Sequence, residues 1–309
     1  SEQCPATHHL IGEVLQEAGF GDGIVNVISN VPDNAAEVVS ALIAHPAVRR
    51  INFTGSTGVG KIIAEQAAKH LKPVLLELGG KAPFLVLDDA DIDAAVDAAI
   101  FGAFFNQGQI CMSTERVIVD HQVADAFVEK FTERARALKA GNPRDEGNTL
   151  GTLINAQSGE KLNSLIDDAV TQGAHLAAGG KAEGVVMQAT VIDGVTSDMR
   201  LYSEESFGPI VAVIRVNGEE EAIHIANDSE YGLSSAVFSR DSARAMKVAG
   251  RLQTGICHIN APTVHDEPQM PFGGVKSSGY GRFGGKAGIE EFTELRWMTM
   301  QLGPRHYPI

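Results

Sequence analysis

The strongest constraint on the fold is the alternation of short β-branched or aliphatic runs with amphipathic helical patterns along the chain. The runs predict strands at residues 25–29, 50–54 and 74–78. An apolar stripe over residues 92–104, preceded by Asp91 as a candidate N-cap, predicts a helix. Alternating strands and helices are typical of α/β proteins, because parallel strands need a crossover connection between them. The predicted fold class is therefore α/β with largely parallel sheets.

The composition limits the classes of partner. The 309 residues carry a formal net charge of −14, and no run of Lys and Arg offsets it. Such a surface repels phosphate backbones and anionic bilayers, so neither nucleic acid nor membrane is expected as a partner. Cys4, Cys111 and Cys257 lie far apart with no Cys-x-x-Cys pair, which indicates neither a disulfide framework nor a metal site. A cytoplasmic location is expected.

A glycine-rich segment follows the predicted strand at residues 50–54. Residues 55–62 read Gly-Ser-Thr-Gly-Val-Gly-Lys-Ile and match the phosphate-binding loop pattern at all positions except the last. That pattern needs Ser or Thr to ligate magnesium, and Ile62 offers no ligand. A strand, a glycine turn and a helix still present backbone N–H groups to a phosphate. The segment indicates a nucleotide site, with a tight turn that binds nothing as the alternative.

Two further side chains have properties that catalysis needs. Glu77 stands in an apolar run, Val-Leu-Leu-Glu-Leu, where desolvation raises the pKa of a carboxyl group toward the range of a general base. The alternative is a glutamate on a polar sheet edge or paired with a lysine. Cys111 lies on a predicted turn between a helix and a strand, where a thiolate can act as a nucleophile. A small buried hydrophobic residue is the alternative there.

Taken together, these features resemble the aldehyde dehydrogenase superfamily. Five motifs carry the resemblance, in the family's order: residues 53–56, 76–81, 105–111, 204–209 and 271–274. The texture of residues 106–120 and 265–285 is similar to the bacterial branch that oxidises aromatic aldehydes such as salicylaldehyde, benzaldehyde or vanillin. The resemblance implies an NAD- or NADP-dependent enzyme that oxidises an aldehyde to the carboxylic acid.

The resemblance also implies roles for individual residues. Cys111 matches the nucleophile that forms a thiohemiacetal and then a thioester, and Glu77 matches the base that activates water for deacylation. Asn260 matches an asparagine near the substrate end. The cofactor-binding positions are matched by Gly55, Ser56, Leu78, Glu205 and Phe207, with Glu2 at the position of a ribose-binding carboxylate that favours NAD over NADP.

The same resemblance implies a domain organisation. Residues 1–79 match the remainder of a nucleotide-binding domain, residues 80–282 the catalytic domain, and residues 283–309 a C-terminal segment with an oligomerisation strand. A homo-oligomer, dimer or tetramer, is expected. The family's ribose-binding lysine and oxyanion-hole asparagine would lie before residue 1. Loss of one oxyanion donor slows such reactions roughly 100- to 1,000-fold, so weak turnover is expected.

Three other functions stay open on the sequence alone. A chain without turnover would act as a binding or assembly module for nucleotide or aldehyde. Cys111 and Glu77 would suffice for a thioesterase or esterase, because acylation and deacylation of an activated ester need no cofactor. A phosphate-binding-loop ATPase is the most distant alternative, given Ile62.

Overall fold

The computed structural model describes residues 3–309, which fold into the predicted α/β architecture. The chain divides into two compact units, one of Ser1–Ile51 with Lys61–Val74 and one of Asn52–Gly60 with Leu75–Ile309. Glu2 lies outside the described residues.

The first unit is mainly helical. It contains α1 (Pro5–Glu17), η1 (Pro32–Asn34) and α2 (Ala35–Ala44), and Nζ of Lys72 donates to the carbonyl of His45 at 2.6 Å just beyond the end of α2. The strand predicted at residues 25–29 is wrong: these residues form irregular backbone and are largely exposed. A β-branched run alone does not make a strand, because a strand needs a hydrogen-bonded neighbour.

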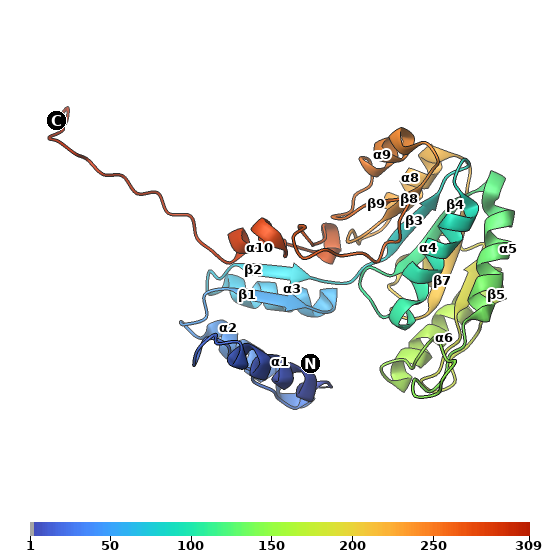
Figure 1. The fold of residues 1–309 in the computed structure, drawn as a ribbon, viewed down its shortest axis with the longest axis horizontal. Coiled ribbons are helices and arrows are strands. Elements are labelled where there is room, and N and C mark those ends of the chain that lie inside the picture. The colour runs from blue at the N-terminus through green and yellow to red at the C-terminus, as the bar shows by residue number, and fades with distance from the viewer. Residues whose placement is uncertain (1–2) are drawn as a thin grey trace. The chain divides into compact units, whose positions relative to one another are not determined.

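The second unit is built on a seven-stranded sheet of order β5-β6-β7-β4-β3-β8-β9 (Figure 1). All neighbouring strands are parallel except β5 and β6. The strands are β3 (Ala82–Val86), β4 (Thr114–Asp120), β5 (His175–Ala178), β6 (Thr190–Asp193), β7 (Ile210–Val216), β8 (Ala236–Phe238) and β9 (His258–Ile259).

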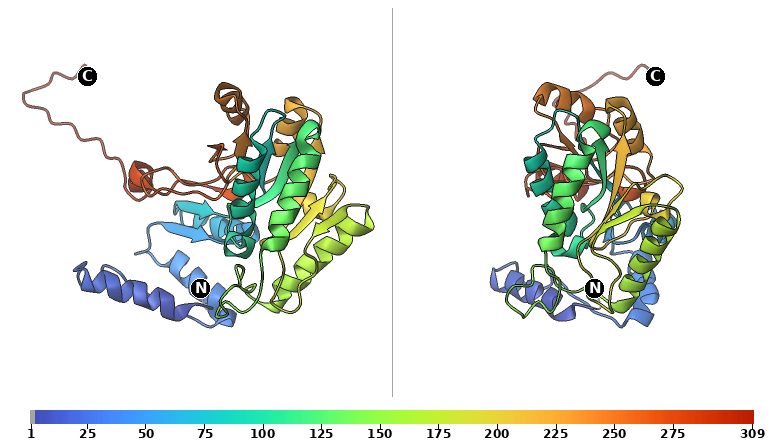
Figure 2. Two further views of the ribbon diagram at one scale, coloured as in Figure 1. Left: turned by 45° about the vertical axis from the view of Figure 1, so that its right-hand side comes forward. Right: turned by 90° about the vertical axis from the view of Figure 1, so that its right-hand side faces the viewer.

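Helices cover both faces of this sheet. In β3, Phe84 and Val86 belong to one hydrophobic core, and Leu85, pointing the other way, belongs to a second. The first core is closed by α4 (Ile92–Phe104) and α5 (His121–Ala137), which lie in front of the sheet in the right panel of Figure 2. The second is closed by α6 (Ala156–Thr171), α8 (Glu219–Asn227) and α9 (Ser242–Ala249), and the four-residue helix α7 (Arg200–Ser203) adds Leu201 and Tyr202 to it.

The predicted N-cap of α4 is confirmed, because the Asp91 carboxylate accepts a hydrogen bond from the backbone N–H of Ala94. Asp120, Asn155 and Asp241 cap α5, α6 and α9 in the same way. These caps fix the start of each helix directly after a strand or a turn.

A second, three-stranded sheet has the order β1-β2-β10, with β1 (Ile51–Thr54) and β2 (Val74–Glu77) confirming two predicted strands. Residues 270–282 contain η3 (Lys276–Ser278) and β10 (Gly279–Tyr280), which pairs antiparallel with β2. α3 (Thr57–Ala68) begins within the glycine-rich segment of residues 55–62.

The chain ends in an extended segment. After α10 (Gly285–Glu291) it runs outward in Figure 1, and residues 295–302, within the segment expected to carry an oligomerisation strand, are irregular backbone in this structure. Its large side chains are exposed, with Leu295 at 106% and Trp297 at 90%.

Candidate active site

Glu77 ends β2 and lies in the protein interior. Its side chain is buried, and its two carboxylate oxygens accept no hydrogen bond from the described residues. Burial raises the pKa of Glu77 to about 8, and the positive charge of Arg282 opposes that rise. A Cβ at Gly273 would lie 2.7 Å from Oε1 of Glu77 and 2.9 Å from Cδ of Arg282, so the glycine leaves room for both side chains. A carboxyl group that titrates near neutrality can act as a base.

Cys111 lies on the turn between α4 and β4, as predicted. The preceding residues Asn106 and Gln107 both have positive φ, 49° and 56°, which non-glycine residues seldom adopt. The Cys111 side chain is half-buried. Burial, followed by the negative charges of Glu77 and Glu205, raises the pKa of this thiol to about 11. The thiol is therefore protonated near pH 7 and must lose its proton before it attacks a carbonyl carbon.

Two glycines let these groups converge. A Cβ at Gly80 would lie 2.3 Å from the carbonyl oxygen of Cys111, and one at Gly79 would lie 2.7 Å from Oε2 of Glu205. The backbone N–H of Gly80 donates to Oε1 of Glu205 at 2.8 Å. The Gly79–Gly80 step therefore brings the Cys111 segment, the end of β2 and the Glu205 carboxylate into contact.

This convergence predicts that Gly80→Ala is harmful. The new methyl group would overlap the Cys111 carbonyl, so the turn that carries the thiol must shift and the free energy of unfolding should fall by roughly 1–3 kcal/mol. Gly58→Ala is the matched control, because a Cβ there meets no atom within 4 Å and Ala favours the helix over Gly. Chemical denaturation of both variants measures the difference. Equal stabilities would contradict the close packing at Gly80.

A second prediction concerns the thiol. In a Cys4→Ser/Cys257→Ala background, where Cys111 is the remaining cysteine of the chain, alkylation by iodoacetamide should accelerate about tenfold per pH unit between pH 8 and pH 10. The physical reason is that only the thiolate reacts, and a pKa near 11 keeps its fraction small below that pH. The rate is followed by intact mass. A rate that levels off below pH 9 would show that the surroundings do not raise the pKa of the Cys111 thiol.

The predicted phosphate turn opens α3. The backbone N–H of Gly55 donates to the carbonyl of Glu77 at 3.0 Å, which ties the turn to β2. Ser56 precedes the helix, and its Oγ accepts from the N–H of Val59 at a long 3.4 Å. The N–H groups of a first helical turn have no intrahelical partner, and the space beside Gly58 is open. This helix start can accept an anion.

Leu78 and Glu205 lie next to glycines of this region, and Phe207 follows Glu205 by two residues. The N–H of Leu78 donates to the carbonyl of Ser278 at 3.1 Å, and its side chain packs on the first turn of α3, where a Cβ at Gly60 would lie 2.6 Å from it. Phe207 has a positive φ of 55° and exposes 41% of its surface. The structure therefore brings Gly55, Leu78 and Glu205 together with Glu77 and Cys111.

Asn260 is held elsewhere. Its side-chain oxygen accepts from the N–H of Ser239 at 3.0 Å, and its amide nitrogen donates to the carbonyl of the same residue at 3.0 Å. These bonds tie the end of β9 to the end of β8. They connect Asn260 to the sheet and not to another predicted site residue.

Sequence reasoning missed the buried charges next to the glycines. Lys81 and Glu115 form an ion pair of 2.6 Å in which both side chains are buried, and Glu115 also accepts from backbone N–H groups of residues 206 and 207. A usable signal existed, because Lys81 directly precedes the apolar strand β3 and Glu115 lies within β4, and a buried charge without a partner is costly.

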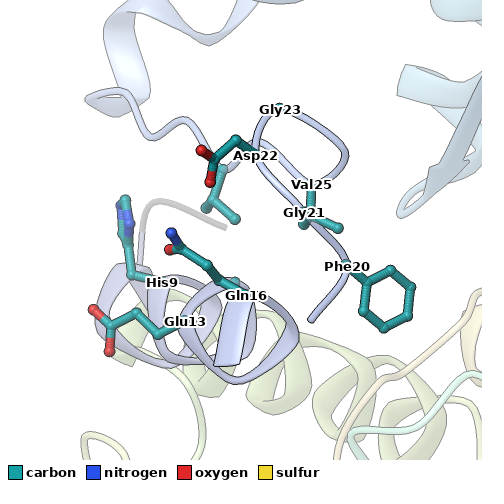
Figure 3. A pocket seen from close by; sticks show the side chains of 10 residues that line it. His9, Glu13, Gln16, Phe20, Gly21, Asp22, Gly23 and Val25 are labelled. Carbon is teal, nitrogen blue, oxygen red and sulfur yellow. The ribbon is translucent and has the colours of Figure 1, made fainter. Parts of the chain in front are cut away.

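The first unit holds a separate pocket of about 330 Å³, formed around α1 and the following loop (Figure 3). His9, Glu13, Gln16 and Asp22 give it polar walls. Across residues 3–309, no group of three or more His, Cys, Asp or Glu side chains is arranged to hold a metal ion. Within the same residues, every helix is too short or too polar to cross a bilayer.

Comparison with known proteins identifies the family of this chain. Residues 1–298 match the aldehyde dehydrogenase family. A vanillin dehydrogenase from Pseudomonas fluorescens is 65% identical over 309 residues, which are 100% of this chain and 64% of that protein. The chain thus spans less than two thirds of the length of this relative.

Solved structures show the same fold. A salicylaldehyde dehydrogenase from Pseudomonas putida G7, in complex with salicylaldehyde, matches with a TM-score of 0.97 at 54% identity, over 99% of this chain and 63% of that chain. An NAD-dependent aldehyde dehydrogenase from Sinorhizobium meliloti matches with a TM-score of 0.94 at 36% identity, over 99% of this chain and 61% of that chain. The resemblance found in the sequence is confirmed, and the chain belongs to the aldehyde dehydrogenase family.

Proposed function

We propose that this protein oxidises an aromatic aldehyde to the carboxylic acid with NAD or NADP as the acceptor. The observation that carries the proposal is the convergence of Cys111, Glu77 and Glu205 at the Gly79–Gly80 step. The thiol of Cys111 suits acylation, and the Glu77 carboxyl group, with a pKa of about 8, suits deacylation. The second carboxylate, Glu205, suits ribose binding.

The surroundings fit a nicotinamide cofactor. The open first turn of α3, with Gly55 and Ser56, offers N–H donors to a pyrophosphate, and Glu205 offers an acceptor to ribose hydroxyls. The exposed ring of Phe207 and the backbone of Leu78 would complete the nicotinamide end. The bound cofactor supplies the hydride acceptor. Glu2 remains the predicted determinant of NAD over NADP.

The chain's own residues perform the covalent steps. The proton of the Cys111 thiol is transferred to the aldehyde oxygen as Sγ forms a bond to the aldehyde carbon, which becomes a tetrahedral thiohemiacetal. Loss of hydride from that carbon and of the hydroxyl proton to solvent leaves a thioester to Sγ. Glu77 in its carboxylate form takes a proton from water, and the resulting hydroxide attacks the thioester carbon. The C–S bond breaks, the acid leaves, and Sγ is free for the next turnover.

The aromatic class of substrate is supported by the relatives. The similar proteins include a vanillin dehydrogenase and a salicylaldehyde dehydrogenase. The test is NADH formation with vanillin, salicylaldehyde and hexanal, with the acid product identified by chromatography. Formation of vanillic or salicylic acid in step with NADH would support the proposal. If the unmodified chain forms no NADH with any of the three aldehydes, the proposed function is refuted.

Ester hydrolysis is a second candidate function. Cys111 and Glu77 lie in one compact unit and need no cofactor to acylate and deacylate on an activated ester. Release of nitrophenol from a nitrophenyl ester, lost on Cys111→Ala, would support it. The two activities use the same thiol and can coexist.

The proposed domain limits at residues 79 and 282 stay predictions. We also propose that the exposed segment at residues 295–302 forms its strand against a second copy of the chain, since unpaired backbone groups and exposed apolar side chains favour such pairing. Light scattering of the chain with and without residues 295–309 distinguishes a homo-oligomer from a monomer.

A further inference from the structure

Two opposite charges that the proposed mechanism does not use lie buried beside Gly80. The Lys81 and Glu115 side chains are 0% and 4% exposed, and Nζ of Lys81 donates to Oε2 of Glu115 at 2.6 Å. Lys81 directly follows Gly80, and Glu115 lies in β4, four residues after Cys111. Burial lowers the pKa of Lys81, and the Glu115 carboxylate opposes that shift. The pair therefore links the segments that carry the two predicted catalytic residues.

The same carboxylate binds a third segment. Oε1 of Glu115 accepts from the backbone N–H groups of Ser206 and Phe207, both at 3.0 Å, and Oε2 accepts from the N–H of Ser206 at 2.8 Å. Nζ of Lys81 also donates to Oγ of Ser206 at 3.1 Å. Glu115 thus binds residues 206 and 207, and Lys81 binds residue 206.

Glu205 lies between the residues that this ion pair binds and Gly80, so these contacts restrict its position. The carboxylate of Glu205 meets the N–H of Gly80 at 2.8 Å, and its carbonyl accepts from Nζ of Lys161 at 2.7 Å. Phe207 keeps a φ of 55°, a conformation that a non-glycine residue holds only when its surroundings impose it. The bond from its N–H to Glu115 is such a constraint.

A buried ion pair is a weak source of net stability, because the loss of hydration offsets the attraction between the charges. Such a pair can still fix the positions of the groups it binds, because charge-assisted hydrogen bonds are short and directional. We propose that the Lys81–Glu115 pair is a positioning device that orients Glu205 and Phe207 for the cofactor. This inference rests on the proposed function, because it assigns Glu205 and Phe207 to the nicotinamide end.

The test is the double variant Lys81→Met/Glu115→Gln, which removes both charges and so avoids leaving one of them buried and unpaired. The matched control is Lys181→Met/Asp167→Asn, which removes an exposed pair of 2.7 Å in the same unit. Hydrogen exchange of the Ser206 and Phe207 amides reports the position of the segment. Isothermal titration with NAD reports cofactor binding, and circular dichroism reports the fold.

We expect the double variant to keep the parental circular dichroism, to exchange the two amides at least about tenfold faster, and to bind NAD roughly tenfold more weakly. The control should match the parent in all three. Unchanged exchange overturns the proposal, as does faster exchange with unchanged NAD affinity. If the parent binds no NAD, the proposed function fails, and hydrogen exchange alone then decides the positioning role.

Discussion

Replacing Cys111 by Ala should reduce aldehyde-dependent NADH formation to background, a loss on the order of 10⁴-fold or more. The methyl group of Ala cannot form the bond to the aldehyde carbon, so neither the thiohemiacetal nor the thioester arises. The substitution removes one sulfur atom from a half-buried position and should leave the fold intact. Initial rates with vanillin or salicylaldehyde, followed at 340 nm, measure the effect.

Cys257→Ala is the matched control for this experiment. Cys257 is also half-buried, burial also raises its pKa, and it lies in the same compact unit. It makes no contact with the Gly79–Gly80 step and should retain at least about half of the parental rate, as most substitutions away from a site do. Similar rates for the parent and Cys111→Ala would remove the thiol from the mechanism, whereas a similar loss in both variants would indicate a general effect of thiol removal.

The sheet of the second unit was predictable in part, because its strands repeat a local pattern. β4 and β7 contain β-branched runs, and the alternation of Phe84, Leu85 and Val86 between two cores follows from the strand period of two. The order of the strands was not predictable, since it depends on contacts between residues far apart in the sequence. The incorrectly predicted strand at residues 25–29 shows the limit: local propensity cannot supply the neighbour that a strand needs.

The site shows the same division. Glu77 and Cys111 stood out because a carboxylate in an apolar run and a cysteine on a turn are unusual locally. The ion pair of Lys81 with Glu115 joins positions 34 residues apart, and the contact of Gly80 with Glu205 joins positions 125 apart. No local pattern encodes such pairs. The Gly79–Gly80 pair indicates that other groups approach the backbone closely there, but only the fold shows that these groups are Cys111 and Glu205.

Glu77→Gln should lower steady-state turnover by roughly 10²- to 10⁴-fold, because the amide cannot take a proton from the hydrolytic water. Acylation needs only the thiol, so the first turnover should persist and the acyl group should accumulate on Cys111. Rapid mixing should show a burst of NADH followed by a slow phase, and intact mass should show the adduct. A matched loss in burst and slow phase would place Glu77 in acylation instead. Glu129→Gln, on the exposed surface of α5, is the control.

The pH dependence supplies an independent check on Glu77. A carboxyl group with a pKa of about 8 is mostly protonated at pH 7, so the parental deacylation rate should rise with pH and level off above about pH 8.

Burial also makes ionisation of Glu77 costly in the folded state. Its contribution to stability is complete below the ordinary value of 4.5 and is lost as pH rises through about 8. Glu77→Gln carries no such cost, so its apparent Tm should exceed the parental value by a few degrees at pH 9 and approach it at pH 5. A parental rate that is flat from pH 6 to pH 9, with no pH-dependent difference in Tm, would show that Glu77 is ionised throughout and is not the tuned base that its surroundings indicate.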